Sequence, residues 1–375
     1  MRILQIINSM SSGGAEKLLV DTCRKMASLG HTIDVFLLRS EETHLLAVIR
    51  EMPGVNIITQ AQYPGIYNPY WILKLRRHLR NHSYDAVQVH LFPAFYWSGL
   101  AGWLAGRKIR LFYTEHNTTN RRRKVALMKI ADRFVYRRYH RIITISDAVD
   151  ESLKHHLGDT RVPITKIYNG INLEEIKQAL PYPPGFFKLP EDSRTLLQVS
   201  SFTPQKDQAT LIRSLLHLPS KYHVFLIGDG PTRRACASQT KALNLENRVH
   251  FMGIRNDVPR LLKSADLVIL ASHFEGLSLS SVEGLASGKP FLASDVPGLR
   301  EVVTGAGVLF PDGDEKALTN MILKLETDHG LRNEIVKNCV ERAEKFNIST
   351  MVEAYLDIYY RESNKNNKQK SQISL

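Results

Sequence analysis

Residues 2–30 read RILQIINSMSSGGAEKLLVDTCRKMASLG. The first six are apolar enough to form a buried parallel strand, and Gly13 and Gly14 follow that run. From residue 15 to residue 29 the apolar side chains recur at helical spacing, and Gly30 is a typical C-terminal cap. A strand, a glycine turn and an amphipathic helix in this order predict the first half of a βαβ unit.

The same alternation continues along the chain of 375 residues, a length that favours two domains. It predicts further strands at 33–38, 55–59, 86–90, 109–113, 141–145, 164–168, 196–199, 223–227, 249–252, 267–270, 291–293 and 308–310. Strands that alternate with helices form parallel sheets covered on both faces. We therefore predict an α/β fold with two doubly wound, Rossmann-like domains and a helical C-terminal end.

A proline-rich stretch at 181–193 separates the two blocks of alternation. Its four prolines and one glycine cannot continue a helix or a central strand, so we predict an interdomain linker there. This places the domains at 1–180 and 194–346. The helix at 348–361 is expected to pack back on the first domain, and the polar tail 362–375 is expected to be disordered.

Composition excludes several classes of protein. Hydrophobic residues make up 43% and charged residues 23%, which is ordinary for a folded chain and unlike a disordered one. Three scattered cysteines show neither a disulfide framework nor metal-ligand spacing, so we expect a cytoplasmic protein. The longest near-apolar stretch, 94–106, is shorter than the roughly 18–20 residues of a membrane span.

The charge balance indicates an anionic partner. Lys and Arg outnumber Asp and Glu by 50 to 37, and the segment 107–141 alone carries 12 basic and two acidic residues. An ordinary solvated helix is one interpretation of this segment. The other interpretation is a surface for anionic lipid head groups or a lipid-diphosphate acceptor at the inner face of the membrane. Residues 67–82 could extend this surface. A nucleic-acid-binding protein is supported by charge alone, so we expect no nucleic acid.

Several loops carry residues suited to anions. Gly13 and Gly14 open a helix, where free amides can bind phosphate, although a simple turn is an equal alternative. Gly228 and Gly230 could likewise be only a tight turn. Lys206 follows the first strand of the second domain and suits an anionic group, although a lone lysine is usually solvated.

The strongest local signal is a pair of carboxylates, Glu275 and Glu283. Glu275 lies in the loop after the apolar strand 267–270, and Glu283 lies within a predicted helix at 279–287. A carboxylate inside such an apolar helix is costly to bury without partners. Sugar hydroxyls are one kind of partner, and a salt bridge is the structural alternative.

The string from Glu275 to Glu283 resembles the Glu-x7-Glu motif of retaining glycosyltransferases with the GT-B fold. Further segments fall where family 4 of these enzymes places its signatures: 13–16, 168–171, 205–206, 228–231 and 288–290. The resemblance covers residues 2 to about 360. It implies two domains facing across a cleft, with the sugar nucleotide held mainly by the second.

The resemblance also implies roles for individual residues. Glu275 would hold hydroxyls of the transferred sugar, Glu283 the ribose, and Lys206 the diphosphate. His116 matches the family's active-site histidine, which gives a catalytic set of His116, Glu275 and Lys206. The implied donor-binding set is Gly13, Gly14, Ser201, Lys206, Gly228, Gly230, Arg255, Glu275, Gly276, Leu277, Ser278 and Glu283.

One position departs from the family pattern: Ser201 stands where the family usually has arginine. A bidentate phosphate donor is lost there, and lysine cannot imitate it. Arg255 or Lys289 could reach in, or Lys206 and the backbone amides could suffice.

The resemblance implies that the enzyme transfers a hexosyl-type sugar from a nucleotide-diphosphate sugar, with UDP as the favoured nucleotide. It also implies that the transfer retains the anomeric configuration and needs no metal. The acceptor would be a glycan or a lipid-linked molecule in bacterial surface polysaccharide or glycoconjugate synthesis. No cofactor is expected, and no Asp-x-Asp occurs in a strand-end loop to hold a metal. A GT-B sugar-nucleotide epimerase is the alternative enzyme.

Overall fold

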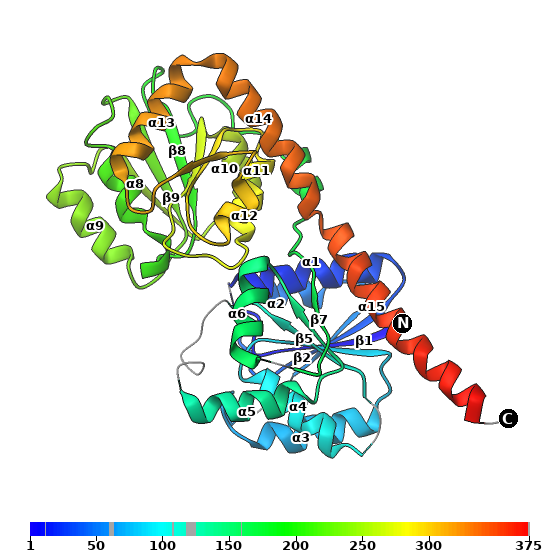
Figure 1. Cartoon of the computed structure of the whole chain (residues 1–375). Coiled ribbons are helices and arrows are strands. Elements are labelled where there is room, and N and C mark those ends of the chain that lie inside the picture. The colour runs from blue at the N-terminus through cyan, green and yellow to red at the C-terminus, as the bar shows by residue number, and fades with distance from the viewer. Residues whose placement is uncertain (12, 60–63, 107–108, 118–124, 159, 374–375) are drawn as a thin grey trace. The chain divides into compact units, whose positions relative to one another are not determined.

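The computed structural model describes residues 1–375 except 12, 60–63, 107–108, 118–124, 159 and 374–375 (Figure 1). The chain forms two compact units. The first unit comprises 1–170 and 348–375, and the second comprises 171–347.

The first unit contains a seven-stranded parallel sheet in the order β3-β2-β1-β4-β5-β6-β7. The strands are β1 (Arg2–Ile7), β2 (Thr32–Leu37), β3 (Val55–Ile58), β4 (Ala86–His90), β5 (Leu111–Glu115), β6 (Arg141–Thr144) and β7 (Ile164–Lys166). The register places Ile3 opposite both Ile33 of β2 and Ala86 of β4. The direction of winding reverses between β1 and β4, which is where ligands of such sheets bind.

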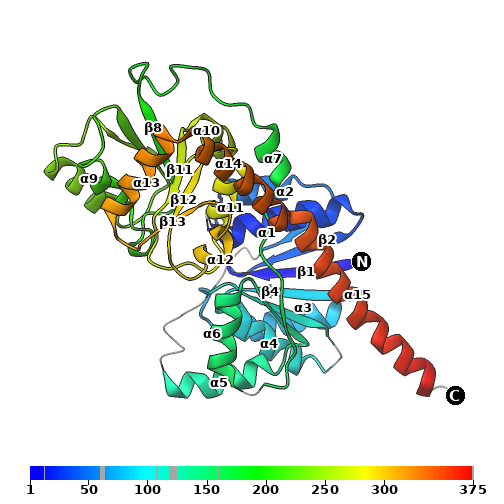
Figure 2. The same ribbon diagram turned by 45° about the horizontal axis from the view of Figure 1, so that its top comes forward.

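Helices cover both faces of this sheet (Figures 1 and 2). They are α1 (Gly14–Ser28), α2 (His44–Arg50), α3 (Tyr70–Asn81), α4 (Ala94–Leu104), α5 (Ala126–Tyr136), α6 (Asp147–Leu157) and α15 (Ile348–Ile373). Because both faces are covered, the strands are continuous apolar runs, and residues 3–7 of β1 are all buried. Helix α15 is fixed to the sheet by Tyr359, whose hydroxyl donates to Gln88 Oε1 at 2.8 Å.

The second unit has a six-stranded parallel sheet in the order β10-β9-β8-β11-β12-β13. Its strands are β8 (Arg194–Val199), β9 (Tyr222–Ile227), β10 (Val249–Gly253), β11 (Leu267–Leu270), β12 (Phe291–Ser294) and β13 (Val308–Phe310). Its helices are α7 (Leu173–Gln178), the 3-10 turn η2 (Pro204–Lys206), α8 (Gln208–Ser214), α9 (Arg233–Ala242), α10 (Val258–Ser264), α11 (Leu279–Ala286), α12 (Leu299–Val303), α13 (Glu315–Thr327), α14 (His329–Ala343) and the 3-10 turn η3 (Glu344–Phe346). The winding reverses between β8 and β11.

The doubly wound fold predicted from the sequence is confirmed. Each predicted strand has a counterpart whose ends differ by at most two residues. Among the described residues no helix combines the length and the apolar character that crossing a membrane requires.

The expected position of the linker is wrong. The chain passes from one unit to the other at Gly170 and Ile171, and the stretch 181–193 lies within the second unit. Tyr182 donates its hydroxyl to Asp257, and the ring of Phe187 lies 4.3 Å from that of Phe225. The prolines therefore shape a surface segment that packs on its own unit. Helix α15 also continues to Ile373, into the residues for which the sequence predicts disorder.

Candidate active site

Glu275 is the centre of a group of polar side chains at the carboxyl edge of the second sheet. It follows β11, and only 5% of its surface is exposed. Its carboxylate accepts hydrogen bonds from Lys206 Nζ, from Ser272 Oγ at 2.8 Å and from Gln205 Nε2 at 3.3 Å. These donors come from the loops after β8 and β11, which are neighbours in the sheet.

The loop that carries Lys206 is tied to its neighbour by Gln198, near the end of β8. The side-chain amide of Gln198 donates to the carbonyl of Lys206 at 2.9 Å and to that of Ala271 at 3.4 Å. After Lys206 the chain adopts a left-handed conformation at Asp207, which caps helix α8 through Thr210. The lysine is therefore held in place by both backbone and side-chain contacts.

Lys206 and Glu275 form a shielded ion pair. The exposed side-chain fractions are 15% and 5%, so both charges have lost most of their water. Such burial is costly unless further hydrogen bonds stabilise the charges, and Ser272 and Gln205 supply these to the carboxylate. A positive group and a hydrogen-bonding carboxylate thus lie side by side, an arrangement suited to a ligand with both phosphate and hydroxyl groups.

The predicted glycines at 228 and 230 allow two loops to touch. Both have positive φ, at 128° and 155°. A Cβ on Gly228 would lie 2.1 Å from the carbonyl oxygen of Ser200, and one on Gly230 would lie 2.3 Å from that of Phe202. The loop after β9 therefore rests directly on the backbone around Ser201. This contact accounts for both glycines, and their part in donor binding remains a prediction.

Helix α11 confirms the predicted helix at 279–287 to within one residue. Ser278 is its N-cap, Leu277 and Ser278 are buried, and Gly276 is half-buried just before them. Glu283 lies inside the helix with 7% of its surface exposed. A largely buried carboxylate at this position agrees with the sequence prediction, and its contact with ribose remains untested.

Arg255 and Lys289 are the two cations that could compensate for Ser201 if Lys206 and the backbone amides do not suffice. Arg255 Nε and Nη2 donate to the two carboxylate oxygens of Asp257 at 2.8 and 2.5 Å. These hydrogen bonds lower the pKa of Asp257 to about 2, so the arginine is held by a strong partner. Lys289 precedes β12 and so lies at the amino edge of the sheet, opposite to Lys206.

In the first unit, His116 follows β5 and belongs to a chain of hydrogen bonds. Its Nε2 lies 3.2 Å from His90 Nδ1, and His90 Nε2 lies 2.9 Å from Gln5 Oε1. Because Gln5 Oε1 can only accept, His90 carries its proton on Nε2 and accepts from His116 Nε2. Burial lowers the pKa of His116 to about 4, so the ring is neutral near pH 7 and its Nδ1 is an acceptor.

Gly13 and Gly14 begin helix α1, as the sequence predicts. The carboxylate of Glu16 folds back over the turn: a Cβ on Gly13 would lie 2.2 Å from Glu16 Oε2. Ser11 Oγ donates to the other oxygen of that carboxylate at 2.8 Å, and burial raises the pKa of Glu16. Phosphate binding by these amides remains a prediction, and a phosphate there would have to displace or avoid Glu16.

One group among the described residues could in principle hold a metal ion: Asp207, His273 and Asp312, whose ligand atoms lie within 4.8 Å of one another. His273 Nδ1 is 2.8 Å from Asp312 Oδ1, and Asp207 already caps helix α8. The side chains therefore satisfy one another. The sequence expectation of a metal-independent enzyme stays a prediction.

Some contacts of the site were missed from the sequence. Ser272 and Gln205 bind Glu275, and His90 binds His116, although only Gln205 belongs to a signature segment named above. Gly298, with φ of 85°, is also needed, since a Cβ there would lie 2.4 Å from the carbonyl oxygen of Glu275. A signal existed for each of the three polar residues: His90 and Ser272 lie at or just after the carboxyl end of a predicted strand, and Gln205 precedes Lys206 in a signature segment.

Comparisons with known proteins agree with this geometry. Residues 12–175 match the family model of Glycosyltransferase Family 4, and residues 185–345 match that of Glycosyl transferases group 1. N-acetyl-alpha-D-glucosaminyl L-malate synthase of Bacillus anthracis is 25% identical over 93% of this chain and 94% of its own length. The UDP-Gal:alpha-D-GlcNAc-diphosphoundecaprenol alpha-1,3-galactosyltransferase of Escherichia coli is 25% identical over 77% of this chain and 78% of its own.

A solved structure shows the same fold. Anabaena HepE in complex with UDP and glucose has a TM-score of 0.82 and 23% identity, covering 96% of this chain and all of that one. The two family models together span most of the sequence. The chain belongs to the family 4 glycosyltransferases and has the GT-B fold.

We predict that Lys206→Ala lowers the free energy of unfolding by roughly 3–5 kcal/mol, because Glu275 would be left as a buried, unpaired charge. Glu275→Gln together with Lys206→Ala should lose clearly less than the sum of the two single variants. Urea unfolding of the four proteins of this double-mutant cycle measures the coupling. Additive losses would show that the two charges do not interact.

Proposed function

We propose that this glycosyltransferase moves a sugar, with retention of configuration, from a nucleotide-diphosphate sugar to a glycan or lipid-linked acceptor. UDP is the favoured nucleotide, and bacterial surface polysaccharide or glycoconjugate synthesis is the favoured context. The observation that carries the proposal is the buried pair of Lys206 and Glu275, held at the carboxyl edge by Ser272 and Gln205.

Relatives support the choice of donor and acceptor. The name of the Escherichia coli relative specifies UDP-Gal and a diphosphoundecaprenol acceptor, and the Anabaena structure with the same fold holds UDP and glucose. A lipid-linked acceptor also suits a first unit rich in basic residues. The reaction would then take place on the cytoplasmic side of the membrane.

The side chains suit the charge changes of such a transfer. When the bond between the anomeric carbon and the diphosphate breaks, negative charge grows on the phosphate oxygens, and Lys206 is placed to stabilise it. Glu275 can accept hydrogen bonds from sugar hydroxyls while Ser272 and Gln205 hold it in position. The new bond forms on the face that the diphosphate leaves, and a phosphate oxygen takes the proton of the acceptor hydroxyl.

His116 would act as a neutral group beside the donor sugar. Its lowered pKa of about 4 excludes a permanent positive charge near pH 7, and its Nδ1 can accept a hydrogen bond from a sugar hydroxyl. His90 and Gln5 fix this tautomer, so they are positioning residues.

We predict transfer from a UDP-sugar that survives excess EDTA, since Lys206 supplies the positive charge that a metal would otherwise supply. UDP-, GDP- and ADP-sugars are compared by thermal shift, and transfer is followed with an undecaprenyl-diphosphate sugar as acceptor. Activity that is lost in EDTA and restored by Mg²⁺ or Mn²⁺ would contradict metal independence. Conversion of the donor with no acceptor present would identify the alternative, an epimerase.

We also propose that Arg233 supplies the guanidinium that is lost where Ser201 replaces the family's usual arginine. Arg233 starts α9, directly after the loop that rests on the backbone around Ser201. Its Nε and the neighbouring Thr232 Oγ1 are buried with no hydrogen-bond partner among the described residues. Its guanidinium lies 5.7 Å from the ring of Phe251, which lies 5.9 Å from that of Phe202.

Replacing this arginine should therefore impair use of the donor. We predict that Arg233→Gln lowers kcat/KM by roughly tenfold or more, the usual loss for a hydrogen bond to a charged group. Arg234→Gln, with the same change of charge on an exposed neighbour, should have little effect. Adding Ser201→Arg to Arg233→Gln should restore much of the activity. Equal effects of the two single variants would exclude a specific role for Arg233.

A membrane contact is proposed for the first unit. The predicted segment 107–141 is only partly described: 107–108 and 118–124, including the cluster 121–124, lie outside the described residues. In the described part, Arg138 lies over the rings of Trp103 and Phe134, at 4.6 and 4.2 Å. Both rings are about half exposed, at 53% and 42%.

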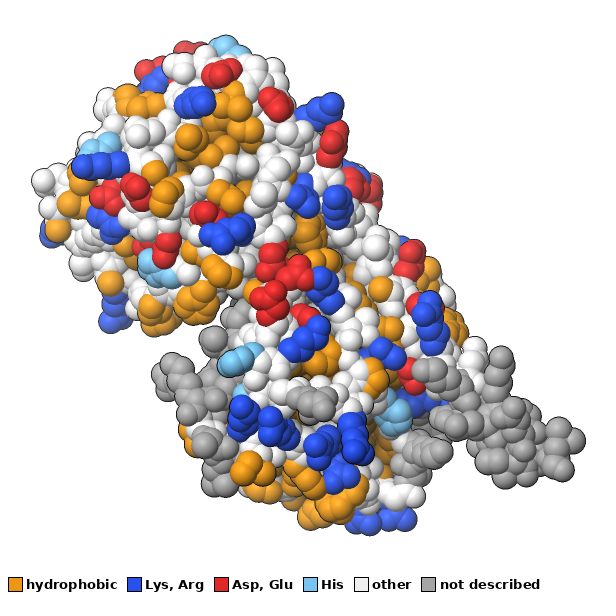
Figure 3. Space-filling view, in the orientation of Figure 1, with side chains coloured by type: hydrophobic (Ala, Val, Ile, Leu, Met, Phe, Trp, Pro, Cys, Tyr) orange, Lys and Arg blue, Asp and Glu red, His pale blue; other side chains and the backbone are white. Residues whose placement is uncertain are grey.

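Other apolar side chains near these rings in the chain are also exposed. They are Leu104, Val125 and Ile130. Figure 3 shows hydrophobic side chains beside Lys and Arg on the side of this unit where α3 and α5 lie in Figure 1. Apolar side chains rimmed by positive charge are suited to an anionic bilayer surface.

We predict that Trp103→Ser with Phe134→Ser strongly reduces flotation with phosphatidylglycerol vesicles, since the apolar anchors are removed. Leu29→Ser with Leu216→Ser removes two exposed leucines elsewhere and serves as the control. Wild-type binding should weaken with salt, because each engaged basic residue contributes about 1 kcal/mol of screened attraction. Equal flotation of the two double variants would argue against this face.

A further inference from the structure

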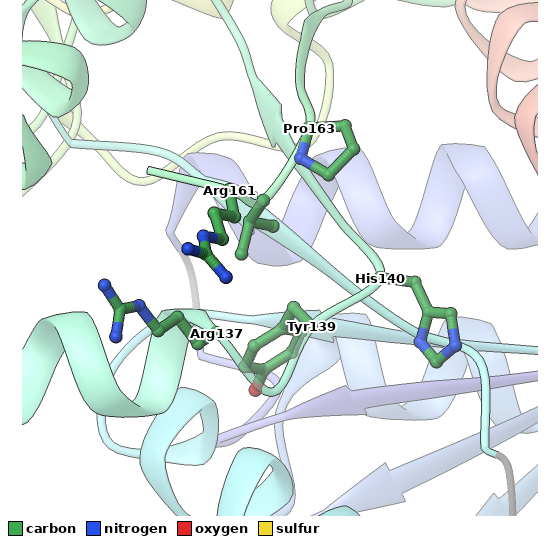
Figure 4. Close-up of a pocket in the computed structure, with 6 residues that line it drawn as sticks. Arg137, Tyr139, His140, Arg161 and Pro163 are labelled. Atoms are coloured by element: carbon green, nitrogen blue, oxygen red, sulfur yellow. The ribbon is translucent and has the colours of Figure 1, made fainter. Parts of the chain in front are cut away.

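A basic pocket lies in the first unit, away from the residues assigned to the reaction. It has a volume of about 560 Å³ and is lined by Arg137, Tyr139, His140, Arg161, Val162 and Pro163 (Figure 4). Residues 137–140 lead into β6, and residues 161–163 lead into β7. The backbone amide of Ile142 donates to the carbonyl of Pro163, which joins the two segments.

The position of this pocket separates it from the active site. Its lining residues precede their strands, so it lies at the amino edge of the parallel sheet. Gly13, His90 and His116 are at or after the ends of their strands, at the carboxyl edge. A pocket at the amino edge therefore has no part in the sugar transfer assigned to the opposite edge.

Two like charges line this pocket. Figure 4 shows the side chains of Arg137 and Arg161 coming from two different segments, with both guanidinium groups on the same side of the pocket. Neither has a hydrogen bond or an ion pair within the described part of the chain, in contrast to Arg133, whose Nε donates to the carbonyl of Leu157. Two unpartnered cations that line one pocket repel one another, and an anion bound there would turn repulsion into attraction.

The remaining walls suit an anion attached to a larger group. His140 Nδ1 accepts from the amide of Leu111 at 3.3 Å, which holds the ring at one wall of the pocket. Tyr139 and Val162 are buried and supply apolar surface. The volume exceeds what a single phosphate ion needs, given that one water occupies about 30 Å³.

We propose that this pocket binds the phosphate group of a phosphate ester. Two planar guanidinium groups can each donate two parallel hydrogen bonds to phosphate oxygens. The source would be either an anionic lipid head group or a small phosphate compound in solution. The lipid is favoured because Arg137 adjoins Arg138, which lies over the exposed rings of Trp103 and Phe134. The lipid source rests on the membrane contact proposed above, whereas phosphate binding itself does not.

The test compares three double variants with the wild-type full chain. Arg137→Gln with Arg161→Gln removes both guanidinium groups. Arg137→Lys with Arg161→Lys keeps the charge but loses the planar fork. Arg234→Gln with Lys241→Gln, on exposed positions of α9 in the other unit, removes the same net charge and is the matched control. Thermal unfolding confirms that each variant is folded.

The probes are phosphatidylglycerol vesicles, phosphatidylcholine vesicles and glycerol 3-phosphate. A lipid site predicts binding to phosphatidylglycerol that falls at least about tenfold in both the Gln and the Lys variant but not in the control. A site for soluble phosphate predicts the same pattern with glycerol 3-phosphate and no difference between variants on vesicles.

Three results would overturn the proposal. The first is a Gln variant that binds every probe as wild type does. The second is a Lys variant that binds as wild type does, and the third is a control that loses as much as the Gln variant. In the last two cases charge alone would explain the binding. UDP binding is measured in parallel and should be unchanged in all variants, so a failure of the transferase proposal is seen separately.

Discussion

The parallel direction of the strands is the constraint on which this structure depends. In each unit all strands point the same way, so each sheet has two chemically different edges. Loops at the carboxyl edge carry Lys206, Glu275 and His116, and loops at the amino edge of the first sheet carry Arg137 and Arg161. Polarity of the sheet therefore sorts residues that are scattered along the chain to opposite edges.

Within the second unit, the site depends on loops pressed closely together. Lys206 and Glu275 are far apart in sequence, yet β8 and β11 are neighbours where the winding reverses. Gly228, Gly230 and Gly298 allow backbone approaches that any side chain would block, and the last of these lies against the carbonyl of Glu275. The close approach of these loops lets a buried ion pair form with its hydrogen bonds satisfied, and this requirement explains why glycine stands at all three positions.

Sequence alone predicted the strands well because strands buried on both faces must be apolar throughout, as in β1 and β11. It misplaced the linker because prolines at 181–190 are equally compatible with a segment that packs on one unit through Tyr182 and Phe187. It also missed two partners of Glu275, Ser272 and Gln205, as residues that hold the carboxylate. Whether Ser272 and Gln205 face the carboxylate depends on loop geometry, which periodicity does not encode.

If Arg233 compensates for Ser201, as proposed, the site keeps its electrostatics while changing its residues. A cation that binds the donor phosphate has to come from a loop at the carboxyl edge, and Lys289 lies at the opposite edge. Arg255 lies at the carboxyl edge, but its guanidinium is already held by Asp257. Arg233 satisfies both conditions, since it follows β9 and its Nε has no partner among the described residues. Because Gly230 brings its loop onto the backbone next to Ser201, a small side chain at 201 leaves room for an arginine from the neighbouring loop. The serine and the arginine are then two parts of one arrangement, which the pattern of a single loop could not predict.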